Sequence, residues 1–343
     1  MRMEKQEAVE LLTHGNPLEL GARADAIRRE RFGNTVTFIV DRNINYTNIC
    51  QNECRFCAFF RRKEHKDAYL LDYDTILAKV RETVEAGGTQ VMIQGGLHPD
   101  LGLPFYEEML RKIKSNFDIT IHSFTATEIQ HFARQAGLSV LETLKRLQAA
   151  GLDSLPGGGA EILSDRVRQI VSPKKIMTDD WLAVMEAAHS IGMKSTATMV
   201  IGLGETMEER IEHMEKIRRL QDKTGGFRAF ITWTFQPGNT DIGGEKVSAW
   251  DYMKTLAMSR IYMDNIDHIQ GSWLTQGERI GQLTLGFGGD DLGSIMLEEN
   301  VVRAAGTRYD MSIRKMVNLI QGAGRDAAQR DTTYRIIKRY ERN

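Results

Sequence analysis

The sequence predicts an α/β protein built as a single TIM-type (β/α)8 barrel, preceded by a helical cap. Short apolar or β-branched runs alternate with amphipathic helical stretches about eight times along the 343 residues. No composition break and no proline-rich linker divides the chain, which has 6 prolines. Glycines and polar residues repeatedly follow the predicted strands, and the C-terminal strand ends are where barrels carry functional groups.

We expect a helical cap over residues 1–34, the barrel over 35–310, and a charged helical tail over 311–343 that packs on the barrel. The first strand is the β-branched run at residues 35–40. Later strands are expected at 90–93, 119–122, 151–155, 195–201, 227–234, 266–270 and 283–285. Helices are expected at 74–86, 104–116, 127–136, 139–150, 178–190, 207–221, 249–263, 273–281 and 294–304.

Two other architectures stay open at this point. A partial (β/α)6 barrel completed by the C-terminal region is one, because the last two predicted strands have the weakest patterns. An open doubly wound sheet is the other, although the chain has no G-x-G-x-x-G loop between a strand and a helix.

Charge and hydropathy exclude several functions. The net charge of −1 gives no basic face for nucleic acid. No apolar run approaches the roughly 20 residues of a membrane span. The N-terminal residues are charged and lack the apolar core of a signal peptide. We therefore expect a cytoplasmic protein, where thiols stay reduced.

All three cysteines of the chain lie within eight residues, as Cys50, Cys54 and Cys57 in a C-x3-C-x2-C pattern. A structural zinc site normally has four protein ligands, and no fourth cysteine exists. A [4Fe–4S] cluster held by three cysteines has one iron open to a small molecule. A disulfide with a spare thiol, or three core cysteines, are the alternatives, and the odd count and crowded spacing argue against both.

Three glycine-containing turns follow predicted strands. The Gly95–Gly96 turn is either a plain connection or a place where backbone is approached closely, which residues without a Cβ permit. Residues 156–161 hold three successive glycines and end at Glu161, which can accept hydrogen bonds from a ribose or an ammonium group. Arg168 beyond it is either a carboxylate ligand or a solvated charge. The turn from Gly202 to Glu205 is either a ligand turn or an ordinary helix start.

Aromatic and amide side chains follow the later strands, and we expect them to form the substrate wall. Asp290 and Asp291 are left without an assigned role, because either can also cap a helix. The candidate substrate-binding residues are His98, Trp233, Gln236, Asn239, Trp273 and Gln276.

The cysteine spacing, with Phe56 before the third cysteine, resembles the signature of the radical S-adenosylmethionine (SAM) enzymes. Residues 41–48, 95–100, 155–161 and 225–227 are similar to one subgroup, which holds the two radical enzymes of the futalosine route to menaquinone and the deazaflavin-forming enzymes of coenzyme F420 synthesis. Within it, residues 231–240, 269–277 and 296–302 resemble the futalosine-route enzyme that closes a ring. Gly289-Asp290 departs from that pattern, which has Ala-Asn.

The resemblance implies that the three cysteines bind a [4Fe–4S] cluster whose open iron holds SAM. One electron from the cluster, supplied by a reductant such as a flavodoxin or ferredoxin, then cleaves SAM to methionine and a 5′-deoxyadenosyl radical. The implied substrate is dehypoxanthine futalosine, which loses its ribose C4′ hydrogen and closes a ring onto its benzoate. The resemblance implies that Gly95, Gly96, Gly202 and Glu205 contact SAM. From their chemistry, Glu161 and Arg168 are further candidate cofactor-binding residues.

Two alternatives to this function remain. One is another enzyme of the subgroup, an aminofutalosine synthase or a deazaflavin synthase subunit. The other is a non-enzymatic iron–sulfur protein, which needs only a ligated cluster and gives the three glycine turns no purpose.

Overall fold

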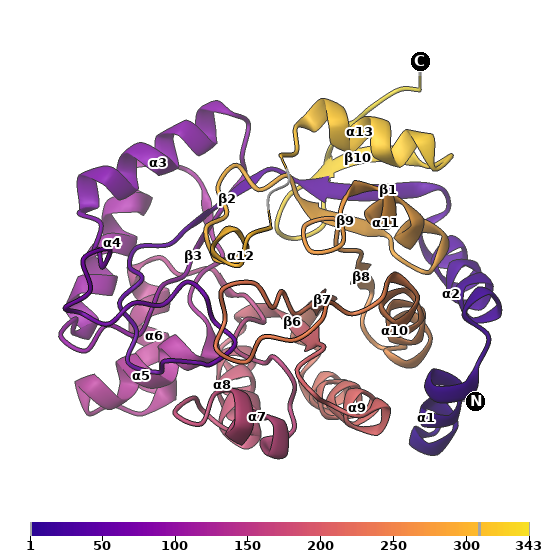
Figure 1. Ribbon diagram of the computed structural model, residues 1–343. Helices are drawn as coiled ribbons and strands as arrows, with labels where there is room; N and C mark the ends of the chain where they lie inside the picture. Colours follow the sequence, from indigo (N-terminus) through magenta and orange to yellow (C-terminus); the bar gives the residue numbers. More distant parts are fainter. Residues whose placement is uncertain (1, 308–309, 343) are drawn as a thin grey trace.

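The computed structural model describes residues 2–307 and 310–342. Strands form the middle of the molecule and helices surround them (Figure 1). The strands are β1 (Thr35–Ile39), β2 (Asp41–Ile44), β3 (Gln90–Ile93), β4 (Thr120–Ile121), β5 (Ser154–Leu155), β6 (Lys194–Ile201), β7 (Phe227–Thr234), β8 (His268–Gln270), β9 (Asp291–Ser294), β10 (Asp326–Arg330) and β11 (Ile336–Arg339). The helices are α1 (Lys5–His14), α2 (Pro17–Phe32), α3 (Tyr73–Glu85), α4 (Leu103–Asn116), α5 (Ala126–Ala136), α6 (Val140–Ala150), α7 (Asp165–Val171), α8 (Thr178–Ser190), α9 (Met207–Thr224), α10 (Ala249–Tyr262), α11 (Glu278–Leu283), α12 (Val301–Ala304) and α13 (Ile313–Gly322).

Parallel pairing connects the strands in chain order. β2, β3 and β4 pair in parallel, and so do β5, β6, β7, β8, β9 and β1. A parallel bridge between His122 and Ser154 links β4 to β5, and only Val40 separates β1 from β2. The two sheets are therefore joined by this bridge on one side and by the chain between β1 and β2 on the other. The α/β barrel fold expected from the sequence is confirmed.

Helix ends carry the signals that the sequence shows. Thr125, Ser139 and Thr206 begin α5, α6 and α9 with capping boxes, in which the hydroxyl and a glutamate three residues later satisfy free backbone N–H groups. Gly137 and Gly225 end α5 and α9 in the left-handed conformation that glycine adopts without strain. These helices pack on the outside of the strands and orient the loops at the strand ends (Figure 1).

The last barrel strand differs from the prediction. Residues 283–285, expected as a strand, end α11 and form a 3-10 turn, η1 (Thr284–Gly286). The predicted helices at 273–281 and 294–304 shrink to α11 and α12, and β9 takes the strand position between them. Asp-Leu-Gly-Ser has no apolar strand pattern, and its burial depends on Asp291 binding Arg330 and Thr37, contacts that lie far apart in sequence.

The C-terminal tail is also only partly helical, which corrects the prediction of a helical tail. After α13 the chain adds β10, parallel to β1, and returns as β11 antiparallel to β10. Ala327 and Ala328 on β10 are buried.

The division into cap, barrel and tail remains a prediction. α1 packs against α9 and α2 against α10, and Leu12, on α1, is buried. None of the described helices combines the length and apolar character needed to cross a membrane.

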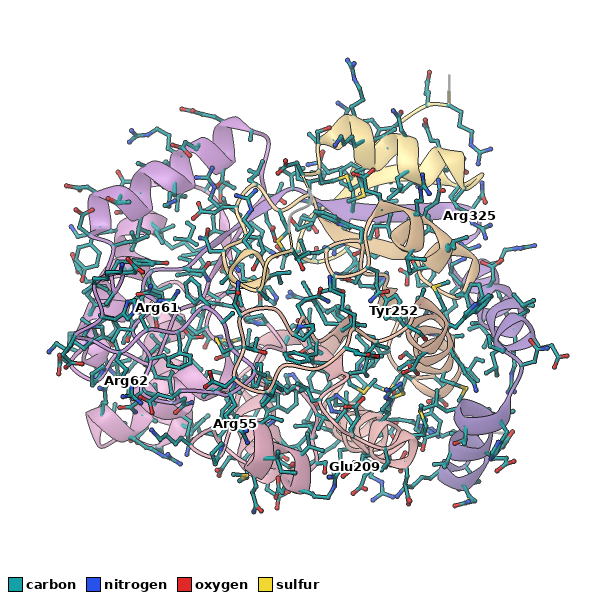
Figure 2. The ribbon with its side chains drawn as sticks, in the orientation of Figure 1. Arg55, Arg61, Arg62, Glu209, Tyr252 and Arg325 are labelled. Atoms are coloured by element: carbon teal, nitrogen blue, oxygen red, sulfur yellow. The ribbon has the colours of Figure 1, made fainter. Side chains whose placement is uncertain are left out.

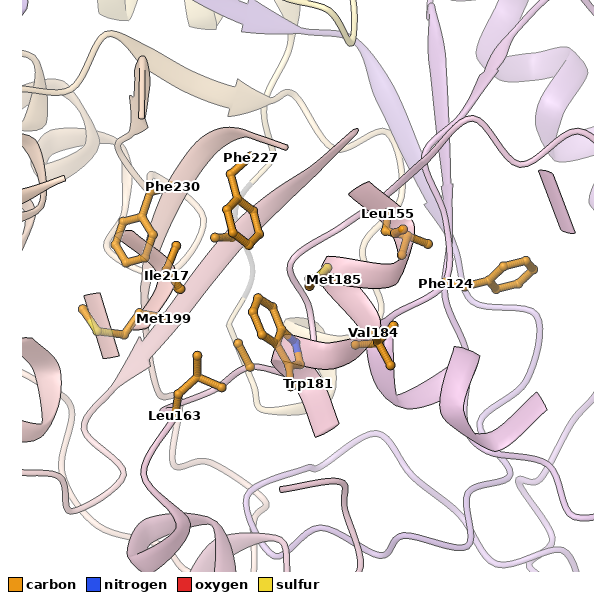
Figure 3. Packing of buried hydrophobic residues seen from close by; sticks show 14 of the residues in the cluster. Phe124, Leu155, Leu163, Trp181, Val184, Met185, Met199, Ile217, Phe227 and Phe230 are labelled. Atoms are coloured by element: carbon orange, nitrogen blue, oxygen red, sulfur yellow. The ribbon is translucent and has the colours of Figure 1, made fainter. Parts of the chain in front are cut away.

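The hydrophobic core contacts the second of the three glycine turns, residues 156–161. Trp181 of α8 is fully buried and stacks on Phe227 with ring centroids 6.3 Å apart (Figure 3). Its Nε1 donates to the carbonyl oxygen of Gly158 at 3.3 Å. A helix packed on the core thus fixes the glycine loop after β5 by a direct hydrogen bond.

Candidate active site

The cysteines lie in the long loop between β2 and α3, and all three are free thiols. Cys54 is buried, while Cys50 and Cys57 are half-buried. The loop is folded by its own backbone: Cys57 N donates to Cys54 O at 3.0 Å, and Cys50 N donates to Arg61 O at 3.1 Å. Arg61, labelled in Figure 2 with its neighbours Arg55 and Arg62, donates to the carbonyl of Phe60 at 2.7 Å. The local sequence therefore builds a compact loop around the three sulfurs.

Burial raises the pKa of the Cys54 thiol to about 12, and it also raises the pKa of the Cys57 thiol. Within the described ranges, no three His, Cys, Asp or Glu side chains are grouped as ligands of a single metal ion. Three free thiols in one folded loop fit the donor set of an iron–sulfur cluster with an open iron.

The turn at Gly95 and Gly96 lies directly against this loop. A Cβ on Gly96 would lie 2.2 Å from the carbonyl oxygen of Ile49 and 2.9 Å from the Cβ of Cys50. A Cβ on Gly95 would lie 2.6 Å from the ring of Tyr46. Both positions therefore require glycine. The groups that approach the backbone of this turn closely belong to the cysteine loop.

Glu161 combines three features of a ligand-binding carboxylate. It is a non-glycine residue at φ 40°, a conformation that costs free energy and is concentrated at functional sites. Its Oε1 accepts from Lys175 Nζ at 2.7 Å, whereas its Oε2 is buried with no hydrogen-bond partner. Glu161 lines the main cavity of the barrel, so this oxygen is placed to accept a hydrogen bond from a bound molecule.

Lys175 links Glu161 to the cysteine loop, and sequence reasoning missed it. Its Nζ lies 5.5 Å from the centroid of the Phe56 ring, next to Cys57. Burial lowers the pKa of Lys175, but Glu161 and Cys54 together raise it by more, so the net pKa is raised. The ammonium group is therefore a fixed positive charge between the carboxylate and the thiols.

Arg168 does not contact the cavity, contrary to its prediction as a cofactor ligand. It is fully buried, and its guanidinium donates to the carbonyl oxygens of Ala160 at 2.5 Å, Gly159 at 3.2 Å and Ile176 at 2.9 Å. Its Nη1 also forms an ion pair with Glu161 Oε2 at 3.7 Å. Arg168 therefore holds the backbone that presents Glu161.

Glu205 has a similar supporting role. Its carboxylate accepts from the backbone N–H groups of Gly202 at 2.9 Å and Leu203 at 2.8 Å, and it pairs with Arg210 at 2.9 Å. Gly202 has φ 95°, and a Cβ there would lie 2.5 Å from Val247. The turn is rigid and glycine-dependent, and Glu205 shapes it from within.

A cavity of about 270 Å³ occupies the barrel interior. Four amide side chains from three strands line it: Asn43 on β2, Gln90 on β3, Gln94 after β3 and Gln270 on β8. The Oδ1 atom of Asn43 is buried without a hydrogen-bond partner. Each amide offers both a donor and an acceptor, so this part of the wall suits the hydroxyl groups of a ligand. The sequence does not identify Asn43 and Gln270 as candidate site residues, because a single amide side chain within a strand belongs to no recognisable motif.

Of the predicted substrate residues, Trp233 lines this cavity. The other five lie outside the set that lines it, and each has a local role. Trp273 is buried and donates to Ser294 O at 3.0 Å, and Gln236 accepts from Thr307 at 3.0 Å. Gln276 donates to Thr234 at 2.7 Å, Asn239 to Ala304 O at 2.8 Å, and His98 accepts from the N–H of Asp100 at 3.1 Å.

The two aspartates with no assigned role are structural ion-pair partners. Asp290 binds Arg260 and lies 2.6 Å from His268 Nδ1. Asp291 accepts from Arg330 at 2.6 Å. Both are buried, and both connect β9 to neighbouring elements.

Comparison with known families agrees with this site. The model of the radical SAM superfamily matches residues 44–217, and that of the CofH/MqnC C-terminal region matches residues 224–342. The chain belongs to the radical SAM superfamily. Radical SAM enzymes bind a [4Fe–4S] cluster and SAM, and the cysteine cluster is present at residues 50–57.

Two curated relatives are cyclic dehypoxanthine futalosine synthases. The chain is 49% identical to that of Streptomyces coelicolor, covering 97% of this chain and 85% of the relative, and 45% identical to that of Halalkalibacterium halodurans, covering 99% and 93%. It is 41% identical to a 5-amino-6-(D-ribitylamino)uracil–L-tyrosine 4-hydroxyphenyl transferase of Methanosarcina barkeri, covering 96% and 89%. The chain is therefore a radical SAM enzyme.

Among solved structures, the fold resembles the FeFe-hydrogenase maturase HydG of Carboxydothermus hydrogenoformans. The TM-score is 0.77 at 18% identity, covering 97% of this chain and 78% of that one. Methylornithine synthase has a TM-score of 0.75 at 19% identity, covering 95% and 94%. At these identities the likeness concerns the fold alone.

Proposed function

We propose that this enzyme cyclises dehypoxanthine futalosine, removing the C4′ hydrogen of its ribose and closing a ring onto its benzoate. The main structural support is an amide-lined cavity with a tryptophan and an unsatisfied Glu161 oxygen. Lys175 connects Glu161 to the loop that holds the three free thiols. The 49% and 45% identities to two cyclic dehypoxanthine futalosine synthases support the same substrate.

In this proposal Cys50, Cys54 and Cys57 are the three ligands of the [4Fe–4S] cluster. The bound cluster and SAM supply the 5′-deoxyadenosyl radical, with one electron from a reductant such as a flavodoxin or ferredoxin. Gly95, Gly96 and the Gly202 turn approach the bound SAM through their backbones, and Glu161 accepts a hydrogen bond from it. Lys175 holds Glu161 in place. Arg168 and Glu205 fix the two loops from behind.

The residues around the cavity orient the substrate and exclude water. Asn43, Gln94 and Gln270 bind the sugar hydroxyls, and Trp233 packs against the arene. Held in this way, C4′ lies near the site of radical formation and the arene lies within bonding reach of C4′. The substrate loses two hydrogens overall: one leaves with the abstraction, and a proton and an electron leave to restore aromaticity. The electron passes to the oxidised [4Fe–4S] cluster, and the proton passes to a base or to water. Free thiols and an iron–sulfur cluster require a reducing compartment, which favours a cytoplasmic location.

The test is turnover by reconstituted protein with SAM and a reductant, followed by mass spectrometry. We offer dehypoxanthine futalosine, a 3-enolpyruvyl benzoate, and 5-amino-6-(D-ribitylamino)uracil with tyrosine in separate reactions. The expected product is dehypoxanthine futalosine minus two hydrogens, and only the first reaction should yield a new compound. Turnover of the second substrate instead would assign the chain to the sister synthase, and turnover of the third to the transferase.

A further inference from the structure

Three basic side chains line the cavity: His122, Arg228 and Arg330. Two of them have no free positive charge with which to bind a ligand. Arg330, at the end of β10, pairs with Asp291 at 2.6 Å and covers the ring of Tyr334. His122, after β4, lies 2.7 Å from the hydroxyl of Ser154, and burial lowers its pKa to about 3. At neutral pH His122 is uncharged, and the Arg330 charge is already neutralised.

Arg228, the first inward-facing residue of β7, is different. Its Nη1 donates to the carbonyl oxygen of Thr332 at 3.5 Å, and no ion pair within the described residues includes it. Two carboxylates act on it from a distance, and each has a closer partner. Asp331 accepts from Arg335 at 3.0 Å, and Asp153 accepts from Lys114 at 2.6 Å.

A half-buried guanidinium without a bound anion is costly, and burial lowers the pKa of Arg228. The carboxylates that line the same cavity, Asp41, Glu161 and Glu299, bind other groups, and none of them forms an ion pair with Arg228 among the described residues. The strongest interaction still available to the Arg228 guanidinium is therefore an ion pair with an anionic group of a ligand. A planar guanidinium binds a carboxylate through two parallel N–H bonds.

The strand register separates this cation from the cysteine end of the cavity. Arg228 and Trp233 both line the cavity on β7, five residues apart. At ~3.3 Å per residue this is about 17 Å along the strand. Gly157, Gly158 and Glu161 line the cavity after β5, at the C-terminal ends of the strands. A ligand with a carboxylate at one end and hydroxyl groups at the other matches this polarity.

We propose that Arg228 binds the carboxylate of the substrate at the floor of the barrel. The benzoate then points down the barrel and the sugar lies beneath the cysteine loop, next to Asn43 and Gln94. This inference rests on the proposed function, and it adds the residue that decides which end of the substrate faces the radical.

The test compares an acid with a neutral analogue in matched variants. We measure binding to the iron-loaded protein without reductant by calorimetry, and kcat and KM with reductant, for dehypoxanthine futalosine and its benzamide analogue. The variants are Arg228→Met, Arg228→Lys and the control Arg219→Met. Arg219 is 77% exposed on α9 and pairs with Glu215 of the same helix. Iron content and SAM affinity are recorded for each variant.

Wild-type protein should prefer the acid to the amide by roughly 10- to 100-fold in Kd. Arg228→Met should lose this factor for the acid, mainly through Kd and KM, and bind the two compounds almost equally. Arg228→Lys should keep part of the preference, and Arg219→Met all of it. Iron content and SAM affinity should not change.

An unchanged acid preference in Arg228→Met overturns the assignment of Arg228, while wild-type turnover leaves the proposed function standing. If wild-type protein neither binds nor converts the acid, the proposed function fails and this inference fails with it.

Discussion

Replacing Gly96 by alanine tests the contact that joins the glycine turn to the cysteine loop. The new Cβ would lie 2.2 Å from Ile49 O and 2.9 Å from the Cβ of Cys50, whereas ordinary contacts begin near 3.4 Å. Backbone must therefore move by roughly 1 Å, at a cost of about 1–3 kcal/mol for an overpacked site. Because Ile49 precedes Cys50, the movement also displaces a proposed iron ligand.

The assay measures two quantities separately. Urea unfolding of the iron-free, reduced protein gives the packing cost, and iron content after reconstitution gives the effect on the cluster. Gly286→Ala is the matched control, since a Cβ at Gly286 meets nothing within 4 Å and φ is not in the left-handed region. The control should change the unfolding free energy by less than about 1 kcal/mol. If Gly96→Ala behaves like Gly286→Ala in both measurements, the packing argument is wrong.

Three further outcomes follow from the site. Alanine at Cys50, Cys54 or Cys57 should abolish SAM cleavage and lower iron content while circular dichroism stays unchanged; a variant with normal cleavage would remove that cysteine from the ligand set. Glu161→Gln should weaken SAM binding about 10-fold or more, as measured by equilibrium dialysis, because a charged acceptor is lost; undiminished affinity would contradict the role of its unsatisfied oxygen. Burial raises the pKa of Glu128 to about 7, so the folded protein binds more protons than the unfolded chain between about pH 4.5 and 7. Unfolding free energy should fall as pH rises through this window, by up to about 1.4 kcal/mol per pH unit. Glu128→Gln should flatten that slope, and Glu142→Gln in the exposed capping box of α6 should not; equal slopes in all three proteins would refute the assignment.

The sequence predicted the parts of the molecule whose signals are local. Amphipathic helices, capping residues and the apolar strands β3, β6 and β7 follow from periodicity and end signals within a few residues. Cys50, Cys54 and Cys57 are close in sequence, so their loop is evident without the fold. A close approach to the backbone at Gly96 was one of two interpretations of the sequence. The group that approaches Gly96 in the structure is the cysteine loop.

The parts that sequence reasoning missed depend on distant contacts. β9 is a polar strand that is buried because Asp291 meets Arg330, which lies 39 residues further on. β10 and β11 follow a helix in a charged segment, and parallel pairing with β1 spans almost the whole chain. Trp273 and Gln236 are aromatic and amide residues of predicted loops, yet their side chains complete local structure. Asn43, Gln270 and Arg228 line the cavity from strands, where an isolated polar residue gives no motif.

The most direct measurement of the central claim follows the C4′ hydrogen. Reconstituted enzyme is incubated with SAM, a reductant and dehypoxanthine futalosine that carries deuterium at C4′ of the ribose. The proposed reaction predicts 5′-deoxyadenosine containing that deuterium and a product two hydrogens lighter than unlabelled substrate. Unlabelled 5′-deoxyadenosine, with the deuterium retained in the substrate, would contradict it.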